Sequence, residues 1–135
     1  MILGIGNDLS NIQRIEKSLQ KFGERFVERT FSEAEKKEMA FRKNISFREY
    51  ACSAAKRFAA KEACSKALGT GFRNGVFMRD IEITHQASGQ PVLTLYNGAL
   101  RRLEMLSGGK KVRLHVTMTD DYPWAQAFVI FEVLP

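Results

Sequence analysis

The sequence of 135 residues has little that would suit a secreted or membrane-bound protein. It contains only two cysteines, two histidines and three prolines. No apolar run approaches the ~20 residues that a membrane span needs, and the start Met-Ile-Leu-Gly-Ile-Gly lacks the basic segment and longer apolar stretch of a secretory signal. We therefore expect a cytoplasmic protein without a membrane partner.

The few metal-binding side chains are badly spaced for zinc. Cys52 and Cys64 lie in what reads as one helix, too far apart along it to form a disulfide, and we expect both to be reduced and buried. A structural zinc site needs about four ligands, usually in close pairs. His85 and His115 are neither paired nor near the cysteines, so the sequence argues against such a site.

What is present is typical of one globular domain. Hydrophobic residues make up 44% and charged residues 27% of the chain, which predicts a single domain over residues 1–135. The formal net charge is +6 at pH 7. This favours an anionic partner, which could be nucleic acid, an acidic protein or a phosphate-rich small molecule.

The N-terminal part predicts a short buried strand and an amphipathic helix. The strand covers residues 2–6, so Asp8 should lie at its end. Ser10 or Asn11 should cap a helix that runs to about Phe22. The apolar positions that should face the core are Ile12, Ile15, Leu19 and Phe22. A row of basic residues should follow the exposed side of the same helix: Arg14, Lys17, Lys21 and Arg25.

The rest of the chain predicts helices first and then strands. Ser32 suits the cap of a helix to about Arg42, and the longest helical signal covers residues 47–68, closed by Gly69. Strands over 78–84 and 91–96 predict a hairpin around Gly89. A helix over 97–106, with Leu100, Leu103 and Leu106 inward, precedes strands over 112–118 and 125–134. This order predicts an α+β fold in which a mainly antiparallel sheet packs with the long helix.

The helix over residues 47–68 separates its side chains into two kinds. At 100° per residue, small apolar residues fill one half, which lets the helix pack closely on a sheet. The other half carries Arg57, Lys61, Glu62, Ser65 and Lys66. We expect this charged arc to face one solvent-accessible region and to suit phosphates and a metal. In the alternative interpretation Glu62 and Lys66 are a surface pair at i,i+4, and Asp8 is a turn or cap residue.

Two segments together resemble the signatures of holo-acyl-carrier-protein synthases, which are 4′-phosphopantetheinyl transferases. The segments are residues 4–8, Gly-Ile-Gly-Asn-Asp, and residues 57–69, which begin Arg-Phe-Ala-Ala-Lys-Glu. The similarity continues through residues 69–71, 79–82, 89–91 and 115–122. It implies a 4′-phosphopantetheinyl transferase-like fold and magnesium-dependent transfer of 4′-phosphopantetheine from coenzyme A to a serine of apo acyl carrier protein. Adenosine 3′,5′-bisphosphate would be released, in support of fatty-acid biosynthesis.

The resemblance also implies roles for individual residues. Asp8 and Glu62 match the magnesium ligands, and Mg²⁺ usually takes one or two protein carboxylates. Glu62 is also the candidate base, directly or through a metal-bound water, and Lys66 would add positive charge at the diphosphate. The residues assigned to coenzyme A are Arg57, Lys61, Lys66, Gly89, Gln90, Pro91 and Thr117.

The chain departs from the family pattern at two of these segments. Gln90 stands where many relatives have lysine, and glutamine can still donate a hydrogen bond. Met118 stands where many relatives have histidine, so it cannot do what that histidine does. His115 should share a side of its strand with Thr117 and not with Met118. We interpret it as a structural or phosphate-adjacent residue and not as the base.

The resemblance gives the basic row a partner, because acyl carrier proteins are strongly acidic. Arg14, Lys17, Lys21 and Arg25 would bind the carrier; otherwise they are a solvated helix face. The family's small members are homotrimers with the site between subunits, so Asp8 and Glu62 would come from one chain and residues 89–91 from the next. Apolar residues on both faces of the final strands, near Val116, Phe128, Ile130 and Phe131, are consistent with subunit association.

Two other functions fit parts of the sequence. A small basic nucleic-acid-binding module would explain the charge, but the aromatic residues follow core spacing and no strand motif or zinc-finger pattern of such modules is present. A catalytically inactive carrier-binding subunit would explain the basic row. The presence of Asp8, Glu62 and Lys66 argues against it, and we expect no nucleic acid partner.

Overall fold

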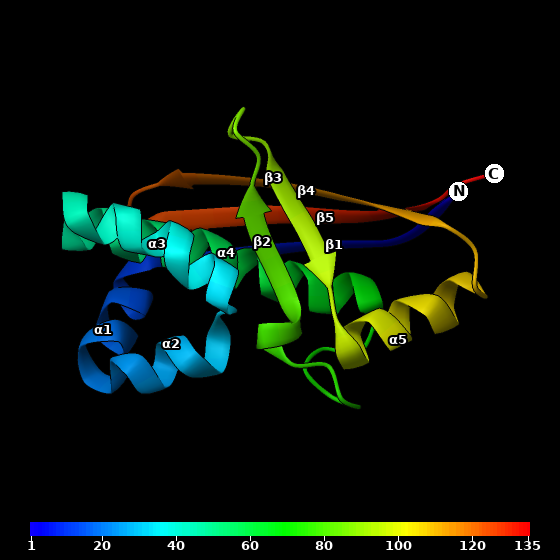
Figure 1. Cartoon of the computed structure of the whole chain (residues 1–135), viewed down its shortest axis with the longest axis horizontal. Helices are drawn as coiled ribbons and strands as arrows, with labels where there is room; N and C mark the ends of the chain where they lie inside the picture. The colour runs from blue at the N-terminus through cyan, green and yellow to red at the C-terminus, as the bar shows by residue number, and fades with distance from the viewer.

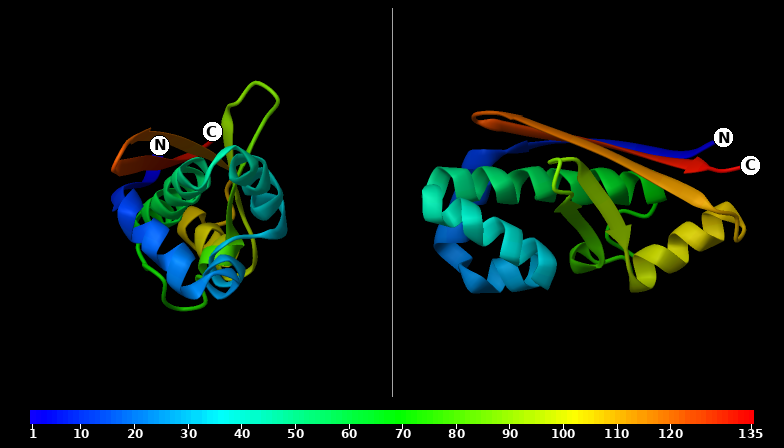
Figure 2. Two further views of the ribbon diagram at one scale, coloured as in Figure 1. Left: turned by 90° about the vertical axis from the view of Figure 1, so that its left-hand side faces the viewer. Right: turned by 45° about the horizontal axis from the view of Figure 1, so that its top comes forward.

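The computed structural model describes all residues, 1–135, and shows a long three-stranded sheet with the helices gathered on one of its faces (Figures 1 and 2). The elements in chain order are β1 (Ile2–Asn11), α1 (Ile12–Phe22), α2 (Glu24–Thr30), α3 (Glu33–Ile45), α4 (Phe47–Leu68), the 3-10 turn η1 (Met78–Asp80), β2 (Ile81–His85), β3 (Pro91–Leu95), α5 (Asn97–Ser107), β4 (Val112–Asp121) and β5 (Trp124–Val133). None of the helices has the length and hydropathy needed to cross a membrane.

All strand pairings are antiparallel, which confirms the predicted α+β class. The larger sheet has the order β1-β5-β4, so β5 is central and β1 and β4 are its edges. Strands β2 and β3 form a separate hairpin that lies across α4 (Figure 1). The predicted helix over residues 47–68 is α4, which packs against both sheets.

Helix α4 lies at the centre of the molecule. Both of its ends are capped, and the side chains on its inner face are small. Ser46 accepts a hydrogen bond from the backbone of Glu49 at the start, and Gly69 closes the end with φ 78°. Ala63 and Ala67 are buried against β1 and β5. This close packing allows a strand to lie directly on the helix.

Two glycines let β1 make that approach. A Cβ at Gly6 would overlap the carbonyl oxygen of Ala63, and a Cβ at Gly4 would overlap that of Ala67. Only glycine fits where two backbones come this close. The Gly-x-Gly spacing therefore sets the height of β1 above α4, and with it the position of Asp8 farther along the strand.

The structure corrects three expectations for the N-terminal segment. Strand β1 continues to Asn11, which pairs with Trp124 of β5, so Asp8 lies within a strand and not at its end. Phe22 is exposed and does not belong to the core, because Gly23 with φ 53° ends α1 directly after it. Arg25 lies beyond Gly23 on the unpredicted helix α2, so the basic row spans two helices.

The bounds of α3 and β2 and the burial of one residue of α5 also differ from the prediction. Helix α3 continues to Ile45, and residues 78–80 form η1 instead of the start of β2. In α5, Leu103 is buried as expected, whereas Leu100 is partly exposed because it lies on the side of the helix away from the sheet cluster.

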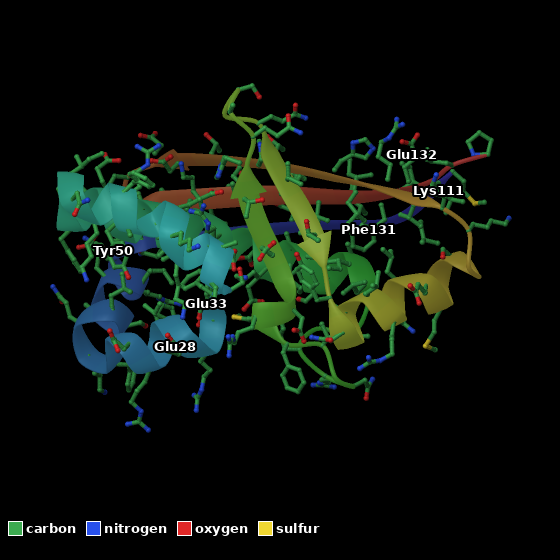
Figure 3. All side chains as sticks on the ribbon, in the orientation of Figure 1. Glu28, Glu33, Tyr50, Lys111, Phe131 and Glu132 are labelled. Atoms are coloured by element: carbon green, nitrogen blue, oxygen red, sulfur yellow. The ribbon has the colours of Figure 1, made fainter.

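The three-stranded sheet has one covered and one open face. Val129 and Phe131 of β5 are buried against the helices, and Figure 3 labels Phe131 among the side chains between the sheet and α4. The other face carries exposed apolar side chains from β1 and β5: Ile5, Leu9, Trp124 and Phe128. No helix covers this face in either view of Figure 2. The expected apolar residues on both faces of the final strands are therefore present.

Candidate functional site

Asp8 and Lys66 meet where β1 crosses α4. The ammonium group Nζ of Lys66 lies 3.2 Å from Oδ1 of Asp8 and donates a hydrogen bond of 3.0 Å to the carbonyl oxygen of Asn7. Ser10, two residues along the same face of β1, donates from Oγ to the other carboxylate oxygen, Oδ2 of Asp8, at 3.1 Å. Both oxygens of Asp8 are thus oriented by neighbouring side chains.

Glu62 lies one turn before Lys66 on α4 and joins the same cluster. Partial burial raises the pKa of its carboxyl group, the negative charge of Asp8 raises that pKa further, and the positive charge of Lys66 lowers it. The net direction is upward, with burial as the largest cause. When both are ionised, the two carboxylates carry one more negative charge than Lys66 neutralises. A cation placed between Asp8 and Glu62 would relieve this repulsion.

These two carboxylates fit a magnesium ion. Mg²⁺ usually takes only one or two carboxylates from protein and completes its six ligands with waters and substrate phosphates. No group of three or more His, Cys, Asp or Glu side chains is close enough to bind a metal by itself. Asp8 and Glu62 therefore suit a metal that arrives with a phosphate ligand better than a permanently bound structural metal.

Lys61 does not face an accessible region, contrary to the sequence prediction. Its side chain has 0% exposed area, and Nζ donates to Oε1 of Glu35 at 2.7 Å, to the carbonyl oxygen of Met78 at 2.9 Å and to that of Ile81. The reason is that α3 and the β2–β3 hairpin cover this side of α4. Burial lowers the pKa of Lys61, and the carboxylate of Glu35 opposes that shift.

Arg57 is also more buried than predicted, with 3% of its area exposed. Its guanidinium group donates to Oε1 of Glu38 at 2.6 Å, to Oγ of Ser53 at 2.5 Å and to the carbonyl oxygen of Ile83 at 3.1 Å. The same residue lines a surface hollow of about 500 Å³ that Gly89 also lines. The structure thus brings together two residues that the sequence analysis assigned to coenzyme A.

The other predicted coenzyme A residues lie away from Asp8. Gln90 and Pro91 follow Gly89, which has φ 89° and donates from its N–H to the carbonyl oxygen of Gln86 at 2.8 Å. Thr117 is exposed on β4, the sheet edge opposite β1. Within one chain, the predicted site residues therefore form two groups, one at the β1–α4 crossing and one at the hollow and the hairpin turn, while Thr117 faces the open side of the sheet.

His115 and Met118 lie on opposite sides of β4, as the alternation predicts. His115 is exposed beside Thr117, and its Nε2 lies 3.1 Å from Oε1 of Glu132, which lowers the pKa of that carboxyl group. Met118 turns the other way and lines the hollow with Arg57 and Gly89. The pairing with Glu132 agrees with a structural role for His115.

Arg25, the last residue of the basic row, lines a second, smaller hollow. Arg14, Lys17 and Lys21 are exposed on α1, and Arg25 is exposed on α2. A hollow of about 260 Å³ between these helices is lined by Ser18, Phe22, Arg25, Phe26 and Arg29. The surface is therefore mixed in character, with exposed aromatic area beside the positive charge.

Comparison with known proteins decides the family. Residues 4–127 match the model of the 4′-phosphopantetheinyl transferase superfamily. The chain belongs to this superfamily. Its relatives include the holo-[acyl-carrier-protein] synthases of Agrobacterium fabrum, 53% identical, and of Parvibaculum lavamentivorans, 54% identical; each alignment covers 100% of this chain and 98% of the relative.

Solved structures of superfamily members have the same fold. The holo-[acyl-carrier-protein] synthase of Neisseria meningitidis is 38% identical with a TM-score of 0.79, over 98% of this chain and 99% of that one. The Helicobacter pylori enzyme, solved in complex with coenzyme A, is 30% identical with a TM-score of 0.76, over 95% of this chain and 99% of that one. The predicted family and fold are confirmed.

Three residues at the candidate site, Ser10, Glu35 and Glu38, were not predicted from the sequence. Ser10 was treated only as a helix cap, although its place two residues after Asp8 in a strand puts both side chains on one face. Glu35 and Glu38 were given no role at the site. The structure shows a capping box at Ser32 and Glu35, but nothing local indicates that these carboxylates also contact α4 and β2.

Proposed function

We propose that this superfamily member is a holo-acyl-carrier-protein synthase. It transfers 4′-phosphopantetheine from coenzyme A to a serine of apo acyl carrier protein and releases adenosine 3′,5′-bisphosphate. The observation that carries the proposal is the meeting of Asp8, Glu62 and Lys66 in a chain that aligns along its whole length with holo-acyl-carrier-protein synthases. The relatives support this function and give no support to the nucleic-acid-binding alternative.

In this proposal Asp8 and Glu62 hold Mg²⁺, which when bound polarises the diphosphate of coenzyme A and neutralises charge on the departing bisphosphate. The serine oxygen forms a bond to the phosphorus attached to pantetheine, and the bond from that phosphorus to the bridging oxygen breaks. Lys66, 3.2 Å from Asp8, places positive charge beside the same oxygens. Glu62 takes the serine proton, directly or through a water.

The second group of site residues suggests where the rest of coenzyme A binds. Arg57, Gly89 and Met118 line the larger hollow, and Gln90, Pro91 and Thr117 lie on the neighbouring turn and strand. We propose that a neighbouring subunit brings its second group of residues to Asp8, so that one coenzyme A molecule contacts both groups. The proposed assembly is a homotrimer with a shared site, and the open apolar face at Ile5, Leu9 and Phe128 is available for the contact.

Subunit mixing tests the shared site. Glu62→Ala protein and a protein altered at residues 89–91 should each be inactive, and mixing them should restore part of the activity, because some interfaces would join the two intact halves. Sedimentation should give three times the mass of the chain. A fully active monomer at the assay concentration would exclude the shared site.

The carrier protein would bind the basic row on α1 and α2. Its acidic surface complements Arg14, Lys17, Lys21 and Arg25, and the hollow beside Phe22 and Phe26 offers apolar contact area. The proposal places the reaction in the cytoplasm and in fatty-acid biosynthesis.

The direct test uses apo acyl carrier protein, coenzyme A and Mg²⁺. Intact-mass measurement should show the carrier gain one phosphopantetheine group, and omission of Mg²⁺ with a chelator present should prevent the gain. A carrier of unchanged mass across several pH values and divalent metals would overturn the proposed function. Binding of the carrier without transfer would instead support an inactive carrier-binding subunit.

A further inference from the structure

Strand β2 has a strand partner on one edge only. It pairs with β3, and the two strands form a sheet of their own. An unpaired strand edge leaves backbone N–H and C=O groups without partners, and a hairpin of two strands is marginally stable alone. The outer edge of β2 is the edge that faces α3 and α4.

The buried part of this edge is bonded to two charged side chains. Lys61 of α4 donates from Nζ to the carbonyl oxygen of Ile81, and Glu35 of α3 accepts from the N–H of Ile83 through Oε2 at 3.1 Å. Both side chains have 0% exposed area, and they lie 2.7 Å apart, Nζ to Oε1. A cation meets the carbonyl group and an anion meets the N–H group.

The same alternation continues toward the hairpin turn. Arg57 donates from Nε to the carbonyl oxygen of Ile83 at 3.1 Å, and Glu38 accepts from the N–H of His85 through Oε2 at 3.0 Å. Oε1 of Glu38 also lies 2.6 Å from Nη2 of Arg57 and 2.8 Å from Nδ1 of His85. Along this edge of β2, the side chains of the helices therefore present a donor, an acceptor, a donor and an acceptor in that order. The backbone of a neighbouring strand would present the same alternation. We call these four side chains, Glu35, Glu38, Arg57 and Lys61, the charged ladder.

The charged ladder contributes more to fixing the register of β2 than to the free energy of unfolding. Buried ion pairs are often no more stabilising than apolar residues of the same size, because removing charges from water is costly. Sliding β2 by one residue, however, would turn its other backbone groups toward α3 and would break the match of acceptor to donor at every ladder position. The charged ladder therefore allows one position of the hairpin.

The hairpin position matters because the turn follows directly. The N–H of Gln86, next to His85, donates to the carbonyl oxygen of Gln90 at 2.9 Å and closes the turn. Gly89, Glu38, Arg57 and His85 line the same hollow of about 500 Å³. We propose that the charged ladder takes the place of a missing strand and so positions the Gly89–Pro91 turn for coenzyme A, with Glu35, Glu38 and Lys61 as positioning residues. This inference rests on the proposed function.

The sharpest test is Glu38→Ala, because Glu38 is the ladder member nearest the turn and is partly exposed, so its loss should be tolerated by the fold. Hydrogen exchange measured by mass spectrometry should become faster in peptides covering residues 83–90. The Michaelis constant for coenzyme A should rise about tenfold, as expected for the loss of a hydrogen bond to a charged group, while the constant for carrier protein stays the same. Glu38→Gln keeps an acceptor oxygen for the N–H of His85 and should recover part of both effects.

Glu33→Ala is the matched control. Glu33 lies on the same helix, where Figure 3 labels it, but its side chain is 75% exposed and pairs with Lys36, which also pairs with Glu28. It should change neither measurement. Faster exchange in Glu38→Ala with an unchanged constant for coenzyme A would overturn the proposal, and so would a raised constant with unchanged exchange. If the wild-type protein transferred no phosphopantetheine, the proposed function would fail, while the exchange data would still decide whether the ladder holds the hairpin.

Discussion

The ammonium group of Lys61 and the carboxylate of Glu35 form an ion pair of 2.7 Å in which neither side chain reaches solvent. Neighbouring backbone groups complete the pair. Glu35 also accepts from the N–H groups of Ser32 and Ile83, and Lys61 donates to two carbonyl oxygens. Each charge therefore depends on the other, and neither can be removed alone without leaving a buried charge.

We expect Lys61→Met to lower the free energy of unfolding by about 3–5 kcal/mol, the usual cost of breaking a buried pair from one side. The double change Lys61→Met with Glu35→Gln should cost clearly less than the two single changes added together, because it leaves no isolated charge. Urea unfolding of the four proteins measures the coupling. Additive effects would mean that the two side chains do not depend on each other.

Removal of either carboxylate at the β1–α4 crossing should stop transfer without unfolding the protein. Asp8→Ala and Glu62→Ala should each reduce the rate at low Mg²⁺ by about 100-fold or more, the scale of losing a group that stabilises transition-state charge. Asp121→Ala removes an exposed carboxylate at the end of β4 and is the control. Undiminished transfer in either variant at low Mg²⁺ would remove that residue from the metal site.

The raised pKa of Glu62 predicts a dependence of stability on pH. Its folded-state pKa lies above its ordinary value of about 4.3, so the folded protein binds this proton more tightly than the unfolded chain does, and stability is lost as pH rises through the raised value. Without metal, Glu62→Gln should therefore melt at a higher temperature than wild type near neutral pH, although it is inactive. The difference should shrink on acidification and vanish near the ordinary value. A variant that melts lower at every pH would contradict this electrostatic account.

The close contact of β1 with α4 predicts that Gly6→Ala is harmful. The added methyl group would overlap the carbonyl oxygen of Ala63, so strand and helix must separate, at a cost of about 1–3 kcal/mol or more. Transfer should fall as well, since Asp8 moves with the strand. Gly109→Ala is a useful comparison, because Gly109 has φ 82° but open space around it. Thermal melting and transfer rates of the two variants separate steric overlap from backbone strain.

Charge reversal in the basic row should act on the carrier protein alone. Arg14→Glu with Lys21→Glu should raise the Michaelis constant for carrier protein far more than that for coenzyme A, and should make transfer less sensitive to salt. Lys110→Glu with Lys111→Glu changes the net charge equally at the other end of the molecule, where Figure 3 labels Lys111, and should have little effect. Equal effects on both substrates would argue against a carrier-specific surface.

The features that the sequence could predict are those with local signals. Helix α4 was predicted over its full length because Gly69 marks its end and neither glycine nor proline lies within residues 47–68. The alternation of β4 placed His115 and Met118 on opposite sides. Helix α2 was missed because it has only seven residues and buries only Thr30, which leaves almost no periodic pattern.

The burial of Arg57 and Lys61 could not be predicted in the same way. On the helix alone they look like an exposed charged arc, and their partners Glu35 and Glu38 lie on another helix. Only the packing of α3 and β2 against α4 shows that these charges are enclosed. The extension of β1 past Asp8 likewise depends on β5, whose residues lie more than 100 positions later in the chain.

The glycine contact between β1 and α4 has a consequence for how the enzyme responds to its substrates. Because Gly4 and Gly6 bring backbone against backbone, the separation of Asp8 from Glu62 is established during folding and depends little on side-chain rotamers. The turn at residues 86–90, in contrast, extends from the body of the protein and is held through side chains (Figure 1). Any adjustment to a bound substrate would therefore occur at this turn, while the spacing of the two carboxylates stays constant from one substrate to the next.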